Sequence, residues 1–231
     1  SVYCGLGALG VFALYRSPDA TTQSAHPPQW GLPLNELTLT LLASTVWAFF
    51  NAAYIVYLSF GARVLVDGGY GPTAAAAVIS LASWVMLFSG ALCGQISDRL
   101  GKPDVVLYVC LAGGIAAMLL LPWTQFAIGL SLLFGLIGMA PAGVIMALTT
   151  QAMAPHRRAF GIGVFFSSYF LVASPAPGIA GWLFDTTEVA YWPMTFAVAL
   201  FLCTGIANAV FRYAQSRLPK PESTPTSQQE A

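Results

Sequence analysis

Long apolar runs without charge are the feature that most restricts what this chain can fold into. Six such runs cover residues 37–60, 73–96, 105–121, 126–153, 160–184 and 191–213. Arg212 is the only charged residue inside them. Each run is long enough for a helix, rising 1.5 Å per residue, to cross the ~30 Å hydrocarbon core of a bilayer. Because backbone polar groups cannot stay unpaired in lipid, the runs are predicted to be transmembrane helices.

The scarcity of charge excludes a soluble fold. Charged residues make up 8% of the chain and hydrophobic residues 57%, whereas soluble domains carry about 25% charged residues. We therefore predict an all-α, polytopic transmembrane bundle of six complete helices and one truncated helix, with the lipid bilayer as its first partner. Lys+Arg and Asp+Glu balance at 9 each, which gives no attraction for nucleic acid.

The bundle divides the chain into four parts. Residues 1–15 are apolar but too short to cross a bilayer, and the chain begins without Met, so they are predicted to be the end of a truncated transmembrane helix. Residues 16–36 form a polar loop, 37–213 the six-helix bundle, and 214–231 a polar tail. Eight of the nine basic residues fall on the side of this loop and tail. The positive-inside rule therefore places both in the cytoplasm.

Neither a metal site nor a cofactor site is predicted. The cysteines lie within apolar stretches without CxxC spacing, and we expect them to be small buried side chains. They are Cys4, Cys93, Cys110 and Cys203. The only histidines, His26 and His156, stand in different loops, so the sequence shows no nucleophile–base pair of a membrane-embedded enzyme. The sequence contains no P-loop motif, which would have indicated that ATP hydrolysis drives the protein. A self-contained small membrane protein, acting as a dimeric pore or scaffold, is the alternative to a transporter.

One short loop carries a family signature. The matching positions are Gly94, Asp98, Arg99, Gly101 and Lys102. Gly101 allows a tight turn between antiparallel helices, whereas a carboxylate at the C-terminal end of a helix is unfavourable with the helix dipole and needs a cationic partner. The pattern resembles the G-x-x-x-D-R-x-G-[RK] signature of the major facilitator superfamily, with Pro103 in place of the second basic residue. The resemblance implies that these residues act as a conformational latch on the cytoplasmic side.

The resemblance extends over nearly the whole chain. The basic segment 155–161 and the Pro/Gly-rich segment 174–185 also resemble the family, which places the chain from the end of its helix 6 to helix 12. The implied protein is a secondary transporter of the plasma membrane that moves a small solute by alternating access, with or without a coupling proton or ion. The implied partner is the missing N-terminal six-helix half of the same protein, and residues 16–36 then join the halves. Residues 35–54 also resemble cyanate-type anion transporters.

Candidate cavity residues follow from helix spacing. Trp47, Asn51 and Tyr54 recur at i, i+4 and i+7 and share one helix face. An amide in lipid must be paired, so Asn51 is expected to contact either solute or a neighbouring helix. Ser167 and Tyr169 are further candidates on the fifth run.

Three prolines are predicted to interrupt helices and to serve as gating kinks: Pro141, Pro175 and Pro177. Proline removes a backbone hydrogen bond, and the glycines before Pro141 increase the conformational freedom of the backbone at that point. No Asp, Glu, Lys, Arg or His lies deep within a run, so proton-relay or substrate-binding charges are expected in the other half.

Overall fold

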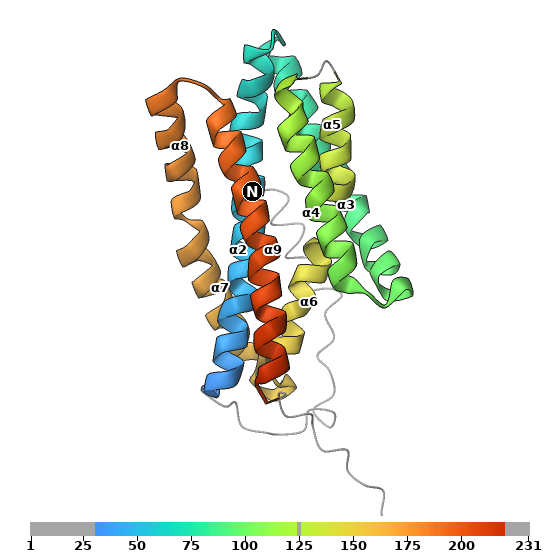
Figure 1. The fold of residues 1–231 in the computed structure, drawn as a ribbon, viewed down its shortest axis with the longest axis vertical. Helices are drawn as coiled ribbons and strands as arrows, with labels where there is room; N and C mark the ends of the chain where they lie inside the picture. Colours follow the sequence, from blue (N-terminus) through green and yellow to red (C-terminus); the bar gives the residue numbers. More distant parts are fainter. Residues whose placement is uncertain (1–30, 124–125, 220–231) are drawn as a thin grey trace, which may run out of the picture.

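Residues 31–123 and 126–219 are described by the computed structural model, and these two stretches form a bundle of helices without strands (Figure 1). The α-helices are α2 (Leu34–Asp67), α3 (Pro72–Leu100), α4 (Pro103–Leu120), α5 (Ala127–Leu133), α6 (Ala142–Ala152), α7 (Arg158–Ala173), α8 (Pro175–Thr187) and α9 (Tyr191–Arg217). Two 3-10 turns, η2 (Leu121–Trp123) and η4 (Pro155–Arg157), and a π-helix, η3 (Phe134–Gly138), complete the chain path.

These elements join into six segments that are long and apolar enough to cross a membrane. They are Leu34–Asp67, Pro72–Leu100, Pro103–Trp123, Ala127–Ala152, Pro155–Thr187 and Tyr191–Arg217. The all-α transmembrane bundle and its six complete helices are therefore confirmed. The first helix runs past the apolar stretch to Asp67, and Arg63 and Asp67 pair at 3.1 Å, one turn apart, in its last turns. The predicted helix of residues 1–15, the loop up to residue 30 and the tail from residue 220 lie outside the described residues.

Stacked aromatic rings hold the centre of the bundle. Phe50 of α2 lies parallel to Phe201 of α9, with ring centroids 5.5 Å apart. Phe134 of η3 stacks on Phe201 at 6.0 Å and on Tyr57 at 3.9 Å, and all four rings are almost fully buried. Within a bilayer lipid tails are as apolar as these rings, so their contribution comes from close packing rather than from removal of water.

Short turns make neighbouring helices antiparallel. Gly101 ends α3 with a left-handed φ of 61°, and its N–H donates to the carbonyl of Ser97 at 3.0 Å. A residue without Cβ adopts that conformation at no steric cost, as the sequence predicted. The start of α2 and the end of α9 lie at the same end of the bundle (Figure 1), where Asn35 Nδ2 donates to the carbonyl of Pro219 at 3.3 Å. We call this the basic end.

Candidate functional site

The six spans are packed unequally. In the most apolar stretch of 18 residues in each span, only 28% of the residues of α3 and 22% of those of the α7–α8 span are buried, against 44–56% in the other four spans. Large side chains stand exposed on them, including Trp84 and Phe88 of α3 and Trp182 of α8. These two spans therefore offer the most surface to lipid or to another helical body.

The predicted face of α2 is present, and its polar groups have partners. Trp47 lies against Phe50, with ring centroids 6.1 Å apart. Asn51 Nδ2 donates to the Trp47 carbonyl at 2.9 Å, and the Tyr54 hydroxyl is hydrogen-bonded to Ser83 Oγ of α3 at 2.8 Å. Asn51 is half-buried, and among the described residues no donor reaches its carbonyl oxygen. The side-chain oxygen of Asn51 is therefore still able to accept a hydrogen bond.

A stripe of hydroxyls on α2 was missed by the sequence reasoning. Thr38, Thr45 and Ser59 recur at multiples of seven residues and are less buried than the core side of the helix. Each hydroxyl donates to the carbonyl four residues earlier, at 2.7, 2.9 and 2.9 Å. Such bonds satisfy the donor but leave lone pairs available. The seven-residue spacing was the signal that could have identified this stripe.

The candidates on the fifth span sit on its exposed side. Ser167 is exposed, and Tyr169 is half-buried between Phe166 and Phe170, with ring centroids 6.3 and 4.6 Å away. Ser168 donates its hydroxyl to the Val164 carbonyl at 2.8 Å. Among the described residues, neither Ser167 nor Tyr169 forms a hydrogen bond or a ring contact with the candidate residues of α2.

The fourth span is interrupted, as predicted around Pro141. α5 ends at Leu133, the π-helix η3 follows, and α6 starts only after Pro141. The π-helix is tightly packed: a Cβ on Gly135 would lie 2.7 Å from Ala82 Cα of α3, and the Gly135 carbonyl accepts a hydrogen bond from Ser89 Oγ at 2.8 Å. Breaks of this kind are the places where a helix changes direction.

The fifth span is divided as well. α7 ends at Ala173 and α8 begins at Pro175, with Ser174 as the single residue between them. Pro175 and Pro177 stand exposed in the first turn of α8, and each lacks the N–H that would continue the hydrogen-bond ladder from α7. Ser174 between the two helices keeps right-handed helical angles, φ −60° and ψ −31°. The α7–α8 junction therefore loses backbone hydrogen bonds, whereas the fourth span changes its type of helix at η3.

The turn that carries the family signature faces outward. Asp98, Arg99 and Lys102 are all exposed, and none forms an ion pair with another residue in the described part of the chain. The sequence predicted a carboxylate held by a cationic partner. Within the described residues, no atom lies within 4 Å of a Cβ added to Gly94, so this side of the motif is open there.

The start of α2 is instead anchored by an ion pair that the sequence reasoning missed. Glu36 is 1% exposed. Its Oε1 accepts a hydrogen bond from Arg157 Nη1 at 2.8 Å, and its Oε2 accepts one from the Ala154 backbone N–H at 3.4 Å. The pair joins α2 to the turn between α6 and α7. Glu36 directly precedes a predicted span, as Asp104 does, and that position was the available signal.

A second polar cluster lies at the basic end between α4, α6 and α9. Arg212 Nε donates to Asp104 Oδ1 at 2.8 Å, while its Nη1 donates to Gln151 Oε1 at 2.6 Å. Asn208, fully buried, donates to the same Asp104 oxygen at 3.1 Å. Gln151 thus accepts from an arginine near the end of α6. Shared acceptors of this kind fix three helices relative to one another.

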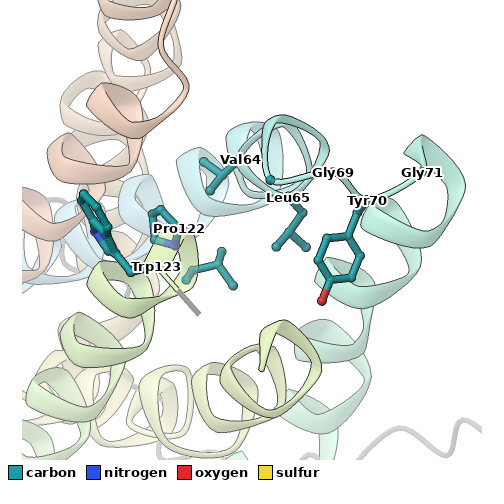
Figure 2. A pocket seen from close by; sticks show the side chains of 9 residues that line it. Val64, Leu65, Gly69, Tyr70, Gly71, Pro122 and Trp123 are labelled. Carbon is teal, nitrogen blue, oxygen red and sulfur yellow. The ribbon is translucent and has the colours of Figure 1, made fainter. Parts of the chain in front are cut away.

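A cavity of about 530 Å³ opens at the other end of the bundle. Its walls are the end of α2, the turn into α3 and the end of the third span, and Tyr70 and Trp123 stand on opposite sides of the hollow (Figure 2). Backbone of Gly68, Gly69 and Gly71 forms much of its rim. None of these residues was a sequence candidate, because glycine-rich turns carry no helical pattern.

Comparison with known proteins gives two matches. A family model described as Major Facilitator Superfamily matches residues 1–177 and residues 40–231. The glycine betaine/proline/ectoine/pipecolic acid transporter OusA of Dickeya dadantii (strain 3937) is 30% identical over 151 residues, which cover 61% of this chain. The match spans 29% of that relative's length.

Proposed function

This chain belongs to the major facilitator superfamily, and we propose that it forms one six-helix half of a secondary transporter that moves a small solute by alternating access. The family and the transporter relative make it a membrane transporter rather than an enzyme. Alternating access requires two helical bodies that rock against each other around a central site. The observation that carries the proposal is the unequal packing of the six spans.

The two open spans supply a docking surface for the other half. α3 and the α7–α8 span are the least buried, and Gly90 and Gly94 on α3 have no atom near the position of an added Cβ. Small residues four apart allow a second helix to approach closely. Helices of the N-terminal half are the proposed occupants, and the signature residues Asp98 and Arg99 then find their partners across that interface.

The interrupted spans supply the movement. Opening and closing a site requires segments that have two arrangements, and breaks in helices are where backbone angles change. The breaks at η3 with Pro141 and at Ser174 with Pro175 and Pro177 meet this requirement. We propose them as the gating kinks.

A zwitterionic solute fits this half better than a free anion. In the described residues, charged side chains occur only near the ends of the spans. An anion such as cyanate would meet no fixed cation at mid-depth, whereas a zwitterion brings both charges with it. The relative is named for glycine betaine, proline, ectoine and pipecolic acid, and we extend that solute class to this chain. The Trp47 ring and the Asn51 carbonyl oxygen are its proposed contacts, since an aromatic face attracts an ammonium group.

The basic end is proposed to face the cytoplasm of a plasma membrane. Arg157, Arg212 and Arg217 cluster there, and basic residues concentrate on the cytoplasmic side. The coupling proton or ion, if one is used, is assigned to ionisable groups of the other half.

Uptake by the full-length protein in sealed vesicles tests the proposal. Labelled glycine betaine, proline, ectoine and cyanate are compared for wild type and for Trp47→Ala and Asn51→Ala, with Leu202→Ala on an exposed side of α9 as the control. We expect uptake of a zwitterion and its loss in the two α2 variants alone. Uptake of cyanate only would overturn the solute class. An immunoblot product of the size of this chain, 24.4 kDa, would favour the self-contained pore or scaffold instead.

A further inference from the structure

Two cysteines from neighbouring helices face the same apolar cavity. Cys93 of α3 and Cys110 of α4 both line a cavity of about 440 Å³, whose other walls include Leu136 and Ile137 of η3. Both side chains are nearly buried, at 4% and 8% exposed, and both thiols lie at the wall of the same apolar space. The sequence predicted small buried side chains here, and their burial is confirmed, but their pairing was not foreseen.

The turn between α3 and α4 explains why the two cysteines lie at a similar depth in the bundle. Cys93 precedes Gly101 by eight residues, and Cys110 follows it by nine. At 1.5 Å per residue, the two positions lie at the same depth, roughly 12–13 Å from the turn, on antiparallel neighbours. The turn therefore accounts for the similar depth of the two cysteines, and the shared cavity wall shows that they face the same space.

We propose that Cys93 and Cys110 form a reversible disulfide when a lipid-soluble quinone reaches this cavity. The two S–H bonds break and one S–S bond forms. The two electrons and two protons leave to the quinone, which becomes a hydroquinone. A disulfide needs sulfur atoms about 2.05 Å apart, and rotation of two cysteine side chains on the wall of one cavity brings their sulfurs toward each other. The apolar walls of the cavity admit a quinone ring and exclude charged oxidants.

The bond would restrain the fourth span, an effect that rests on the proposed function. Cys93 lies one turn beyond Ser89, which donates to the Gly135 carbonyl in the π-helix. Joining α3 to α4 there narrows the space into which Leu136 and Ile137 project. The joined helices α3 and α4 then restrict any change in the shape of η3. Oxidation of the two cysteines is therefore expected to lower the rate of solute uptake.

The test uses the full-length protein in lipid vesicles. The protein is treated with tetramethyl-benzoquinone, which has no free ring position for thiol addition, and separately with copper phenanthroline. It is then denatured, alkylated and mapped by mass spectrometry. We expect a linked peptide pair carrying Cys93 and Cys110, lighter by two hydrogens than the separate peptides and separated again by dithiothreitol. Cys93→Ser and Cys110→Ser should each abolish it. Cys203→Ser is the matched control, since half-buried Cys203 of α9 does not line this cavity.

Two results overturn the inference. Full alkylation of both cysteines after both oxidants would exclude the disulfide, and linkage of either one to Cys203 would exclude the pairing. Solute uptake measured on the same vesicles tests whether the disulfide regulates transport. After oxidation, uptake should fall in the wild-type protein and stay unchanged in Cys93→Ser. Dithiothreitol should restore the uptake of the wild-type protein. If the linked peptide forms while uptake stays constant, the regulatory role is wrong. If untreated protein transports nothing, the proposed function fails and the mapping result is unaffected.

Discussion

Glu36 and Arg157 form a nearly buried ion pair across 121 residues of sequence, with Oε1 and Nη1 2.8 Å apart. The pair connects the first helix of the bundle to the turn after the interrupted fourth span. Any movement of α6 and α7 is therefore transmitted to the start of α2 or must break this contact.

Removing the charge of Glu36 should destabilise the protein. In Glu36→Gln the guanidinium of Arg157 loses its buried carboxylate, and breaking one partner of a buried pair costs about 3 kcal/mol. The midpoint of thermal unfolding in detergent should fall measurably. Arg63→Gln is the control, because its pair with Asp67 is exposed and such pairs contribute about 0.5 kcal/mol. Equal midpoints for the two variants would contradict the anchoring role.

Adding a methyl group to the π-helix should be costly. In Gly135→Ala the new Cβ meets the backbone of Ala82, and overpacking of this kind costs about 1–3 kcal/mol. Gly129→Ala in the same span meets open space and should be neutral or stabilising, since alanine favours a helix by roughly 1 kcal/mol. Thermal unfolding of both variants checks the difference. A stable Gly135→Ala protein would show that η3 has room to shift.

Replacing Arg212 by lysine should loosen the basic end. Arg212 donates to Asp104, Gln151 and Gln215 at once, and a lysine ammonium cannot reproduce that planar fork. We expect a loss of about 1–2 kcal/mol in unfolding free energy. Arg217→Lys, at the end of α9, should leave stability unchanged. The idea fails if both substitutions behave alike in denaturant unfolding.

The signature turn should govern transport rather than folding. Asp98 is exposed and makes no ion pair with any described residue, so Asp98→Asn should insert into the membrane normally. If Asp98 pairs with the other half, its loss shifts the balance between states by about 1.4 kcal/mol, which is tenfold in a conformational equilibrium. Initial uptake rates of the full-length protein measure this, with Asp185→Asn as control. Unchanged uptake would end the latch hypothesis.

The local features were predictable because each depends on a few adjacent residues. Run length identified six spans, since a bilayer requires a fixed number of apolar residues and leaves no backbone group unpaired. Gly101 predicted a turn and Pro141 predicted a break in a helix. Both predictions rest on the backbone angles that the residue type itself allows.

The polar contacts were decided by tertiary structure. Nothing near Glu36 points to Arg157, and nothing near Asp104 points to Arg212, 108 residues away. In a soluble helix the apolar stripe would tell which side faces the core. Here lipid-facing and core-facing residues are both apolar, so the sequence does not reveal how each helix is rotated about its own axis. The sequence by itself determined how many helices cross the membrane and where they turn or break; their rotation, and with it every long-range pair, was determined only by packing.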